Sequence, residues 1–245
     1  MTEVLVTHPR FSIYGEIHNQ IDNDIYKEIF ASFAKDEIVM CEHTTFQPFL
    51  DMEQKAIEKV GFSRLLNKMN GSEWIYLKCL SEQKPVIGVD VRAEKGFPLA
   101  VEETEFLTNG VSDPVQCLTF VKNVLTNAIQ YKESYAKYPE IKEMYGGLTR
   151  QIMECYQQLR RIFSGDDEDE CNVIQKTSVS LKRLAGLFVD VHIMDLLTEC
   201  LKNGDGPHIS IFVGARHATT LYKVLSSSYE LSYEITEKCK EIVGM

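Results

Sequence analysis

The fold is decided near the start of the chain by the stretch Phe11-Ser12-Ile13-Tyr14-Gly15-Glu16-Ile17-His18-Asn19. Its first half is apolar and rich in β-prone residues, which predicts a strand over residues 11–15. The run breaks at Gly15 and then delivers an acid, Glu16, and an imidazole, His18, two residues apart. Apolar residues at helical spacing follow, and they predict a helix over residues 21–34. We therefore expect a strand that ends in a turn carrying ionisable side chains.

The same strand-then-helix pattern continues along the chain. Four further strands are predicted, over residues 37–41, 85–89, 208–213 and 229–235. Further helices are predicted over residues 47–60, 62–69 and 72–83, and from the fourth strand to about residue 225. Strands that alternate with helices imply parallel, right-handed βαβ units. We therefore expect an α/β fold with a mostly parallel sheet of about five strands flanked by helices.

The middle of the chain departs from this pattern. No strand is predicted between residues 93 and 206, and helical patterns cover residues 115–138, 141–163 and 173–203. A connection of this length far exceeds a single crossover helix. We expect residues 93–206 to form a large helical insertion before the fourth strand, within one α/β domain over residues 1–245. We also expect this insertion to cap the site and to set the substrate.

Composition and charge limit the classes of partner. The chain has 245 residues and a net charge of −10, with 36 acidic and 26 basic side chains. An acidic surface repels phosphate backbones, so we expect no nucleic-acid partner. The seven cysteines include no pair two or three residues apart, which argues against a disulfide framework and a zinc ribbon and for a reducing compartment. Without a signal-like or membrane-length apolar run, we expect a cytoplasmic protein with no membrane association.

Ionisable residues follow each of the four strands that are predicted to be parallel. They are Glu16 and His18, Glu42 and His43, Asp90 and Arg92, and Arg216 and His217. Ligands of open parallel sheets bind beyond the carboxyl ends of the strands, where these loops converge. Residues two apart in an extended segment point the same way, so Glu16 with His18, and Asp90 with Arg92, are expected to face this crevice together. The sequence therefore predicts one shared site at this edge.

Three of the four pairs also have a structural interpretation. Glu16 and His18 suit the capping of a turn, and Glu42 with His43 suits a surface loop. Asp90 and Arg92 suit an ion pair that closes a loop. His217 is the strongest single candidate because it lies on a strand-to-helix turn, where the positive end of the helix dipole favours the neutral imidazole of a base or metal ligand.

Two short motifs resemble a known superfamily. Gly15-Glu16-Ile17-His18-Asn19 and Gly214-Ala215-Arg216-His217 are similar to the paired Gly-x-x-His motifs of the superfamily that contains the TraB and Tiki proteins, the erythromycin-esterase-like hydrolases and the ChaN-like haem-binding proteins. Glu42 and Asp90 fall where that pattern places acids. The first motif is closest to the Gly-Glu-x-His-Asp form of the ChaN-like branch, with Asn19 in place of Asp. The likeness covers roughly the first ninety and the last forty residues, and it leaves the branch open.

The resemblance implies a hydrolase that acts on a small molecule or a peptide, in one of two versions. In the metal-dependent version, His18 and His217, with Glu16 or Glu42, bind a divalent transition metal and leave a position open for water. In the metal-free version, His18 is the general base, and Glu16 and Glu42 orient it and the water. The residues expected to contact substrate are His43, Asp90, Arg92 and Arg216, and either arginine would stabilise developing negative charge.

Two non-enzymatic alternatives stay open. The same crevice could bind haem or another small ligand, as the ChaN-like resemblance implies, with axial ligands from Tyr14 and the imidazoles. The chain could instead be an interaction module in which the site is vestigial and the helical insertion is the working surface.

Overall fold

The computed structural model describes residues 4–17, 23–45, 47–66, 69, 71–97, 113–165, 170–202, 204–236 and 239–240. The chain divides into two compact units. The first unit comprises residues 1–91 and 192–245, and the second comprises residues 92–191. The boundary at residue 191 falls inside helix α9 (Glu170–Leu201).

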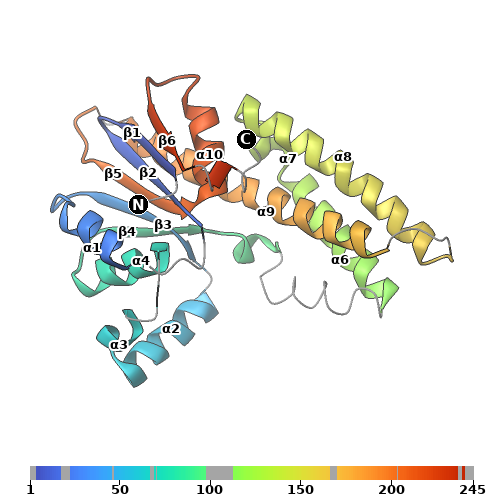
Figure 1. Cartoon of the computed structure of the whole chain (residues 1–245), viewed down its shortest axis with the longest axis horizontal. Helices are drawn as coiled ribbons and strands as arrows, with labels where there is room; N and C mark the ends of the chain where they lie inside the picture. Colours follow the sequence, from blue (N-terminus) through green and yellow to red (C-terminus); the bar gives the residue numbers. More distant parts are fainter. Residues whose placement is uncertain are drawn as a thin grey trace. The chain divides into compact units, whose positions relative to one another are not determined.

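A mostly parallel sheet forms the core of the first unit (Figure 1). Its strands in the described residues are β1 (Val4–His8), β2 (Phe11–Glu16), β3 (Ile38–Thr44), β4 (Val86–Asp90), β5 (Ile209–Gly214) and β6 (Ser232–Ile235). They are arranged in the order β4-β3-β5-β2-β1-β6. Strands β4, β3, β5 and β2 run parallel, whereas β1 is antiparallel to both β2 and β6. The predicted α/β class is confirmed, and the carboxyl ends of the four parallel strands lie at one edge.

The described sheet has six strands, so the predicted number of about five is too low. The strand that the sequence prediction missed is β1, which pairs with β2 in a hairpin from Val4 opposite Gly15 to His8 opposite Phe11. Val4 and Val6 are fully buried and their neighbours are only half-buried, as expected for a strand with one buried face. The run is short and ends at Pro9, and its strand character depends on the partner beside it.

Helices α1 (Asn23–Ala31) and α4 (Gly71–Ser81) pack on one face of the sheet. Apolar residues at helical spacing on α1 and α4 meet the side chains of β3 and β5. The buried residues of this cluster are Tyr26, Phe30, Phe33, Val39, Cys41, Trp74, Ile75, Cys79 and Phe212. Between β3 and α4 the chain forms α2 (Gln47–Val60), with the predicted bounds, and α3 (Phe62–Leu66), which begins at the predicted residue but ends before residue 69.

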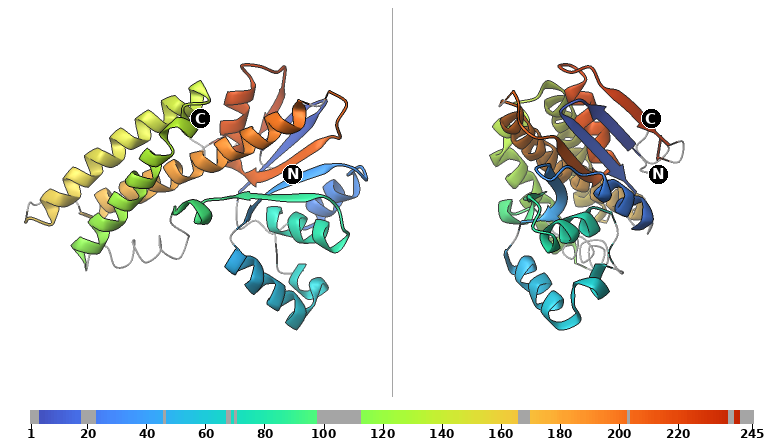
Figure 2. Two further views of the ribbon diagram at one scale, coloured as in Figure 1. Left: turned by 180° about the vertical axis from the view of Figure 1, so that it is seen from behind. Right: turned by 90° about the vertical axis from the view of Figure 1, so that its left-hand side faces the viewer.

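Helix α10 (Ala215–Leu225) packs against β1, β2 and β5, on the face opposite α1 and α4 (Figure 2). Successive residues of a strand point to opposite faces: Tyr14 packs on the α1–α4 cluster, while Gly15 faces α10. A Cβ atom on Gly15 would lie 2.7 Å from the Cβ of Ala218 and 3.1 Å from the Cα of Ala215. The absence of a side chain at Gly15 therefore allows α10 to approach β2 closely.

The second unit is helical. It contains η1 (Ala93–Lys95), α6 (Pro114–Gln130), α7 (Lys132–Tyr135), α8 (Pro139–Ile162) and the part of α9 up to residue 191. Helix α6 begins with Pro114 after Asp113, whose carboxylate accepts hydrogen bonds from the N–H groups of Val115 and Gln116. This unit ends earlier than the predicted boundary at residue 206, because the last turns of α9 belong to the first unit. Its role as a cap stays a prediction.

The core of the second unit is built around Tyr135. Its ring is fully buried, and its hydroxyl donates a hydrogen bond to the carbonyl oxygen of Leu184 at 3.2 Å. The rings of Phe188 and Tyr145 lie 5.9 and 4.6 Å from it, centroid to centroid. Side chains from α7, α8 and α9 thus share one core. In the described part of the chain, no helix combines the length and apolar character needed to cross a membrane.

Candidate functional site

A carboxylate and an imidazole meet where β3 and β5 end. Oε2 of Glu42 accepts a hydrogen bond from the N–H of Gly214 at 2.7 Å, and Oε1 of Glu42 lies 3.4 Å from Nε2 of His217. The two side chains are mostly buried, with 9% of Glu42 and 13% of His217 exposed. The sequence places these residues far apart, and the parallel pairing of β3 with β5 brings them together.

The start of α10 explains why the carboxylate lies here. Gly214 is the N-cap residue, in an extended conformation, and has no side chain to cap the helix. Glu42 supplies a negatively charged acceptor from the neighbouring strand, close to the positive end of the helix dipole. His217 is the third residue of the helix, so its ring rises from the same first turn. The site is therefore fixed by a strand end and a helix start.

The separation of Glu42 and His217 is compatible with two kinds of chemistry. A distance of 3.4 Å is longer than a strong charge-assisted hydrogen bond, yet it allows a carboxylate to orient an imidazole. Two ligands about 2.0–2.1 Å from one tetrahedral ion also lie roughly 3.4 Å apart. Among the described residues, however, no group of three or more His, Cys, Asp or Glu side chains could hold a metal ion. A metal would therefore need a further ligand from outside them.

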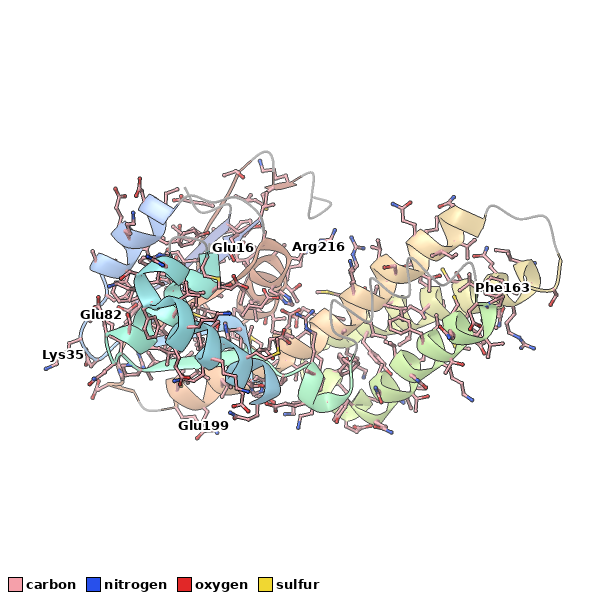
Figure 3. All side chains as sticks on the ribbon, turned by 90° about the horizontal axis from the view of Figure 1, so that it is seen from below. Glu16, Lys35, Glu82, Phe163, Glu199 and Arg216 are labelled. Carbon is pink, nitrogen blue, oxygen red and sulfur yellow. The ribbon has the colours of Figure 1, made fainter. Side chains whose placement is uncertain are left out.

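Glu16 lies on the other face of the sheet. Its Oε2 accepts a hydrogen bond from the hydroxyl of Tyr26 at 2.6 Å, and its Oε1 accepts from the N–H and the hydroxyl of Ser72, both at 3.1 Å. Gly71 has φ +55°, and a Cβ atom there would collide with the Glu16 carboxylate. Glu16 therefore joins β2 and α1 to the start of α4. Figure 3 shows Glu16 and, on α10, Arg216.

His43 points to the same face as Glu16, away from its neighbour Glu42. Its Nε2 lies 3.1 Å from Oε1 of Glu53 on α2, and its Nδ1 lies 3.1 Å from the carbonyl oxygen of Thr44. Its ring is stacked on Tyr76 of α4, with centroids 3.9 Å apart and an angle of 8° between the planes. His43 thus contacts α2 and α4, two of the three helices between β3 and β4.

The pKa of His43 is raised above its ordinary value by its surroundings. Burial acts first and lowers the pKa, but the hydrogen bond and the charge of Glu53 outweigh it, with smaller contributions from the Thr44 carbonyl and the charge of Glu73. Burial raises the pKa of Tyr76, and the charge of Glu53 adds to this effect. The environment therefore favours an imidazolium beside a carboxylate.

The other residues predicted to contact substrate are Asp90, Arg92 and Arg216. The carbonyl oxygen of Asp90 accepts hydrogen bonds from the N–H and the hydroxyl of Thr45, at 3.2 and 3.3 Å, and its side chain is half-buried. Arg92 precedes η1 and belongs to the second unit, so its predicted joint orientation with Asp90 stays a prediction. Arg216 is exposed in the first turn of α10, next to His217.

The two other predicted candidates are His18 and Tyr14. His18 lies outside the described residues, so its roles as base and metal ligand stay predictions. Tyr14, the possible axial ligand, is stacked on Phe212 with ring centroids 4.6 Å apart. Burial raises its pKa, and its hydrogen bonds with Ser12 and Ser210 offset part of that rise.

The sequence analysis missed the partners of the predicted residues. Glu53 holds His43, and Ser72 and Tyr26 hold Glu16. Glu53 is one of several acids on an amphipathic helix, and nothing in its spacing separates it from them. The pair Gly71-Ser72 at a predicted helix start was the one available signal for a bound carboxylate.

No protein-family model matches the chain, and comparisons with curated proteins and with solved structures find no match either. The superfamily suggested by the two Gly-x-x-His motifs therefore stays a prediction.

Proposed function

We propose that the chain is a hydrolase in which Glu42 and His217 are the acid–base pair. The observation that carries this proposal is the position of Oε1 of Glu42, 3.4 Å from Nε2 of His217, with both side chains mostly buried at the carboxyl edge of a parallel sheet. Carboxylate–imidazole pairs in such surroundings are suited to general acid–base catalysis near neutral pH.

In this proposal the two side chains have separate tasks. Glu42, held by the N–H of Gly214, accepts a hydrogen bond from the protonated Nε2 of His217. The lone pair of the imidazole then resides on Nδ1, which takes a proton from water as the water attacks the substrate and then gives it to the leaving alcohol or amine. Glu42 stabilises the imidazolium that results, as the carboxylate does in a catalytic triad. Arg216, in the same helical turn, supplies positive charge for the developing oxyanion.

The substrate class is a small molecule or a peptide with an ester or amide bond. In the metal-dependent version, Glu42 and His217 would provide two ligands, and the ion would lower the pKa of its bound water. The ligand spacing favours this version, and the lack of a third ligand among the described residues counts against it. The metal content of the protein decides between the two.

A hydrolysis screen tests the proposal. Protein purified without chelator is incubated with chromogenic esters and fluorogenic peptides, and its metal content is measured by mass spectrometry. We expect hydrolysis by the wild type and its loss in His217→Gln and Glu42→Gln. His208→Gln is the matched control, because His208 lies at the start of β5, at the opposite edge of the sheet, and bonds to Ser12. Equal hydrolysis by the wild type and both dyad variants would overturn the proposal.

A further inference from the structure

The pairing of β3 with β4 is irregular near the end of β3, at Glu42 and His43. β3 pairs with β5 as far as Cys41 opposite Phe212. On the other side, Cys41 pairs with Gly88 and Thr44 with Asp90, so β3 advances three residues while β4 advances two. Glu42 and His43 are the residues in this bulge. Neither ladder pairs Glu42 or His43, although the side chains still alternate: Cys41 lies in the α1–α4 cluster and Glu42 is directed to α10.

Side chains hold the bulge in addition to the ladder pairs on either side of it. Glu42 is directed to α10, and its neighbour His43 is directed to α2 and α4. The ring of His43 is held at both nitrogens and on one face, by Glu53, the Thr44 carbonyl and Tyr76. Because Glu42 and His43 are joined by one peptide bond, fixing His43 restricts where the carboxylate of Glu42 can lie.

Glu53 is distinctive among the polar side chains of α2. The other side-chain hydrogen bonds of this helix, Gln47 to Asp51 and Gln54 to Glu58, stay within it. Among the described residues, the bond from Glu53 to His43 is the one side-chain hydrogen bond that leaves α2 for the sheet. Glu53 is also largely shielded, with 20% of its side chain exposed, whereas Glu58 is exposed.

We propose that Glu53 is a positioning residue for Glu42: through His43 it fixes the bulge of β3, so that Glu42 stays on the Gly214 amide and beside His217. The importance of Glu53 for catalysis rests on the proposed function, but its effect on the position of Glu42 does not. Among the described residues, the side-chain hydrogen bond of Glu53 is made to His43, and Gly214 and His217 are reached only through the chain at Glu42.

The amide of Gly214 reports the position of Glu42 without any substrate. In the wild type it donates to a carboxylate at 2.7 Å, so its proton resonates downfield and exchanges slowly with solvent. We expect Glu53→Ala to shift this resonance upfield and to speed its exchange at least about tenfold, toward the values of Glu42→Ala. Glu53→Gln should restore most of the wild-type value, since an amide oxygen still accepts from Nε2 of His43.

Two further variants keep the test decisive. Glu58→Gln, on the exposed side of the same helix, is the control and should leave the Gly214 amide unchanged. Glu53→Asp withdraws the carboxylate by one methylene, and it replaces Glu53→Ala if the latter does not fold. The proposal would be overturned if the Gly214 amide kept its wild-type shift and exchange rate in these Glu53 variants while the amides of residues 47–60 exchanged faster. Glu53 would then stabilise only α2. A responding amide in a protein without hydrolytic activity would overturn only the proposed function.

Discussion

Oε1 of Glu42 lies 3.4 Å from Nε2 of His217, so the end of β3 supplies a carboxylate to an imidazole in the first turn of α10. If this pair is the acid–base group, His217→Gln should lower kcat/KM on the best substrate by about 10²- to 10⁴-fold, because the proton acceptor is lost. Glu42→Gln should cost less, because the imidazole that takes the proton remains. Steady-state kinetics on both variants check the order of these effects.

The kinetic comparison is valid only if both variants fold like the wild type. Glutamine keeps a polar side chain beside Glu42, so the free energy of unfolding of His217→Gln should stay within about 1 kcal/mol of the wild type. Glu42→Ala removes the acceptor of the Gly214 N–H and should cost about 1–3 kcal/mol. Urea denaturation measures both. A large loss of stability in His217→Gln would make the dyad a structural feature instead.

The sequence predicts where the strands end, but it does not predict to which face of the sheet the side chains at those ends point. Apolar runs located β2 and β3, and the residues after them, Glu16 and Glu42, were expected to share one crevice. The structure puts them on opposite faces of the sheet. Glu16 follows Gly15, which faces α10, so Glu16 must face α1 and α4. Glu42 follows Cys41, which lies in the α1–α4 cluster, so Glu42 faces α10. Both steps require knowing which helix covers which face of the sheet.

The contact partners of the predicted residues could not be read from the sequence, for a related reason. The contact of Glu53 with His43 depends on where α2 packs. The sequence pattern of an amphipathic helix does not distinguish one of its acidic residues from another. The hairpin of β1 with β2 likewise depends on a partner strand. Local periodicity therefore predicts elements, whereas long-range pairing decides which ionisable groups meet.

Glu16 should behave as a structural residue at the start of α4. Glu16→Ala removes the acceptor for Ser72 and Tyr26, and we expect it to lower the free energy of unfolding by about 1–3 kcal/mol. Glu16→Gln keeps one acceptor oxygen and should lose less. Urea denaturation and hydrolysis are measured on both. A stable Glu16→Gln variant with activity as low as His217→Gln would restore Glu16 to the catalytic group that the sequence predicts.

Gly15 should set how closely α10 approaches the sheet. In Gly15→Ala, the new Cβ would lie 2.7 Å from the Cβ atoms of Ala218 and Val4, so one of the neighbours must move. We expect a loss of about 1–3 kcal/mol in the free energy of unfolding. Ala218→Gly in the same chain should recover part of it by making room on the α10 side. If Gly15→Ala is as stable as the wild type, the close approach of α10 and β2 is not a constraint.

The pair of His43 and Glu53 should stabilise the protein more in mild acid than in base. The pKa of folded His43 is raised above its ordinary value of 6.5. Its contribution to stability is therefore fully present below about pH 6.5 and is lost as the pH rises through the folded pKa. The charged groups that face the ring are Glu53 on α2 and Glu73 on α4, and Tyr76 also contacts it.

A double-mutant cycle of His43→Gln and Glu53→Gln isolates this interaction. From urea denaturation we expect a coupling energy of about 1–2 kcal/mol at pH 6 and a clearly smaller one at pH 9, because the neutral imidazole retains a hydrogen bond but no charge. Glu58→Gln in place of Glu53→Gln should show no coupling with His43→Gln at either pH, since Glu58 bonds within its own helix. A coupling energy that is equal at both pH values, or larger at pH 9, would mean that His43 is neutral in the folded protein.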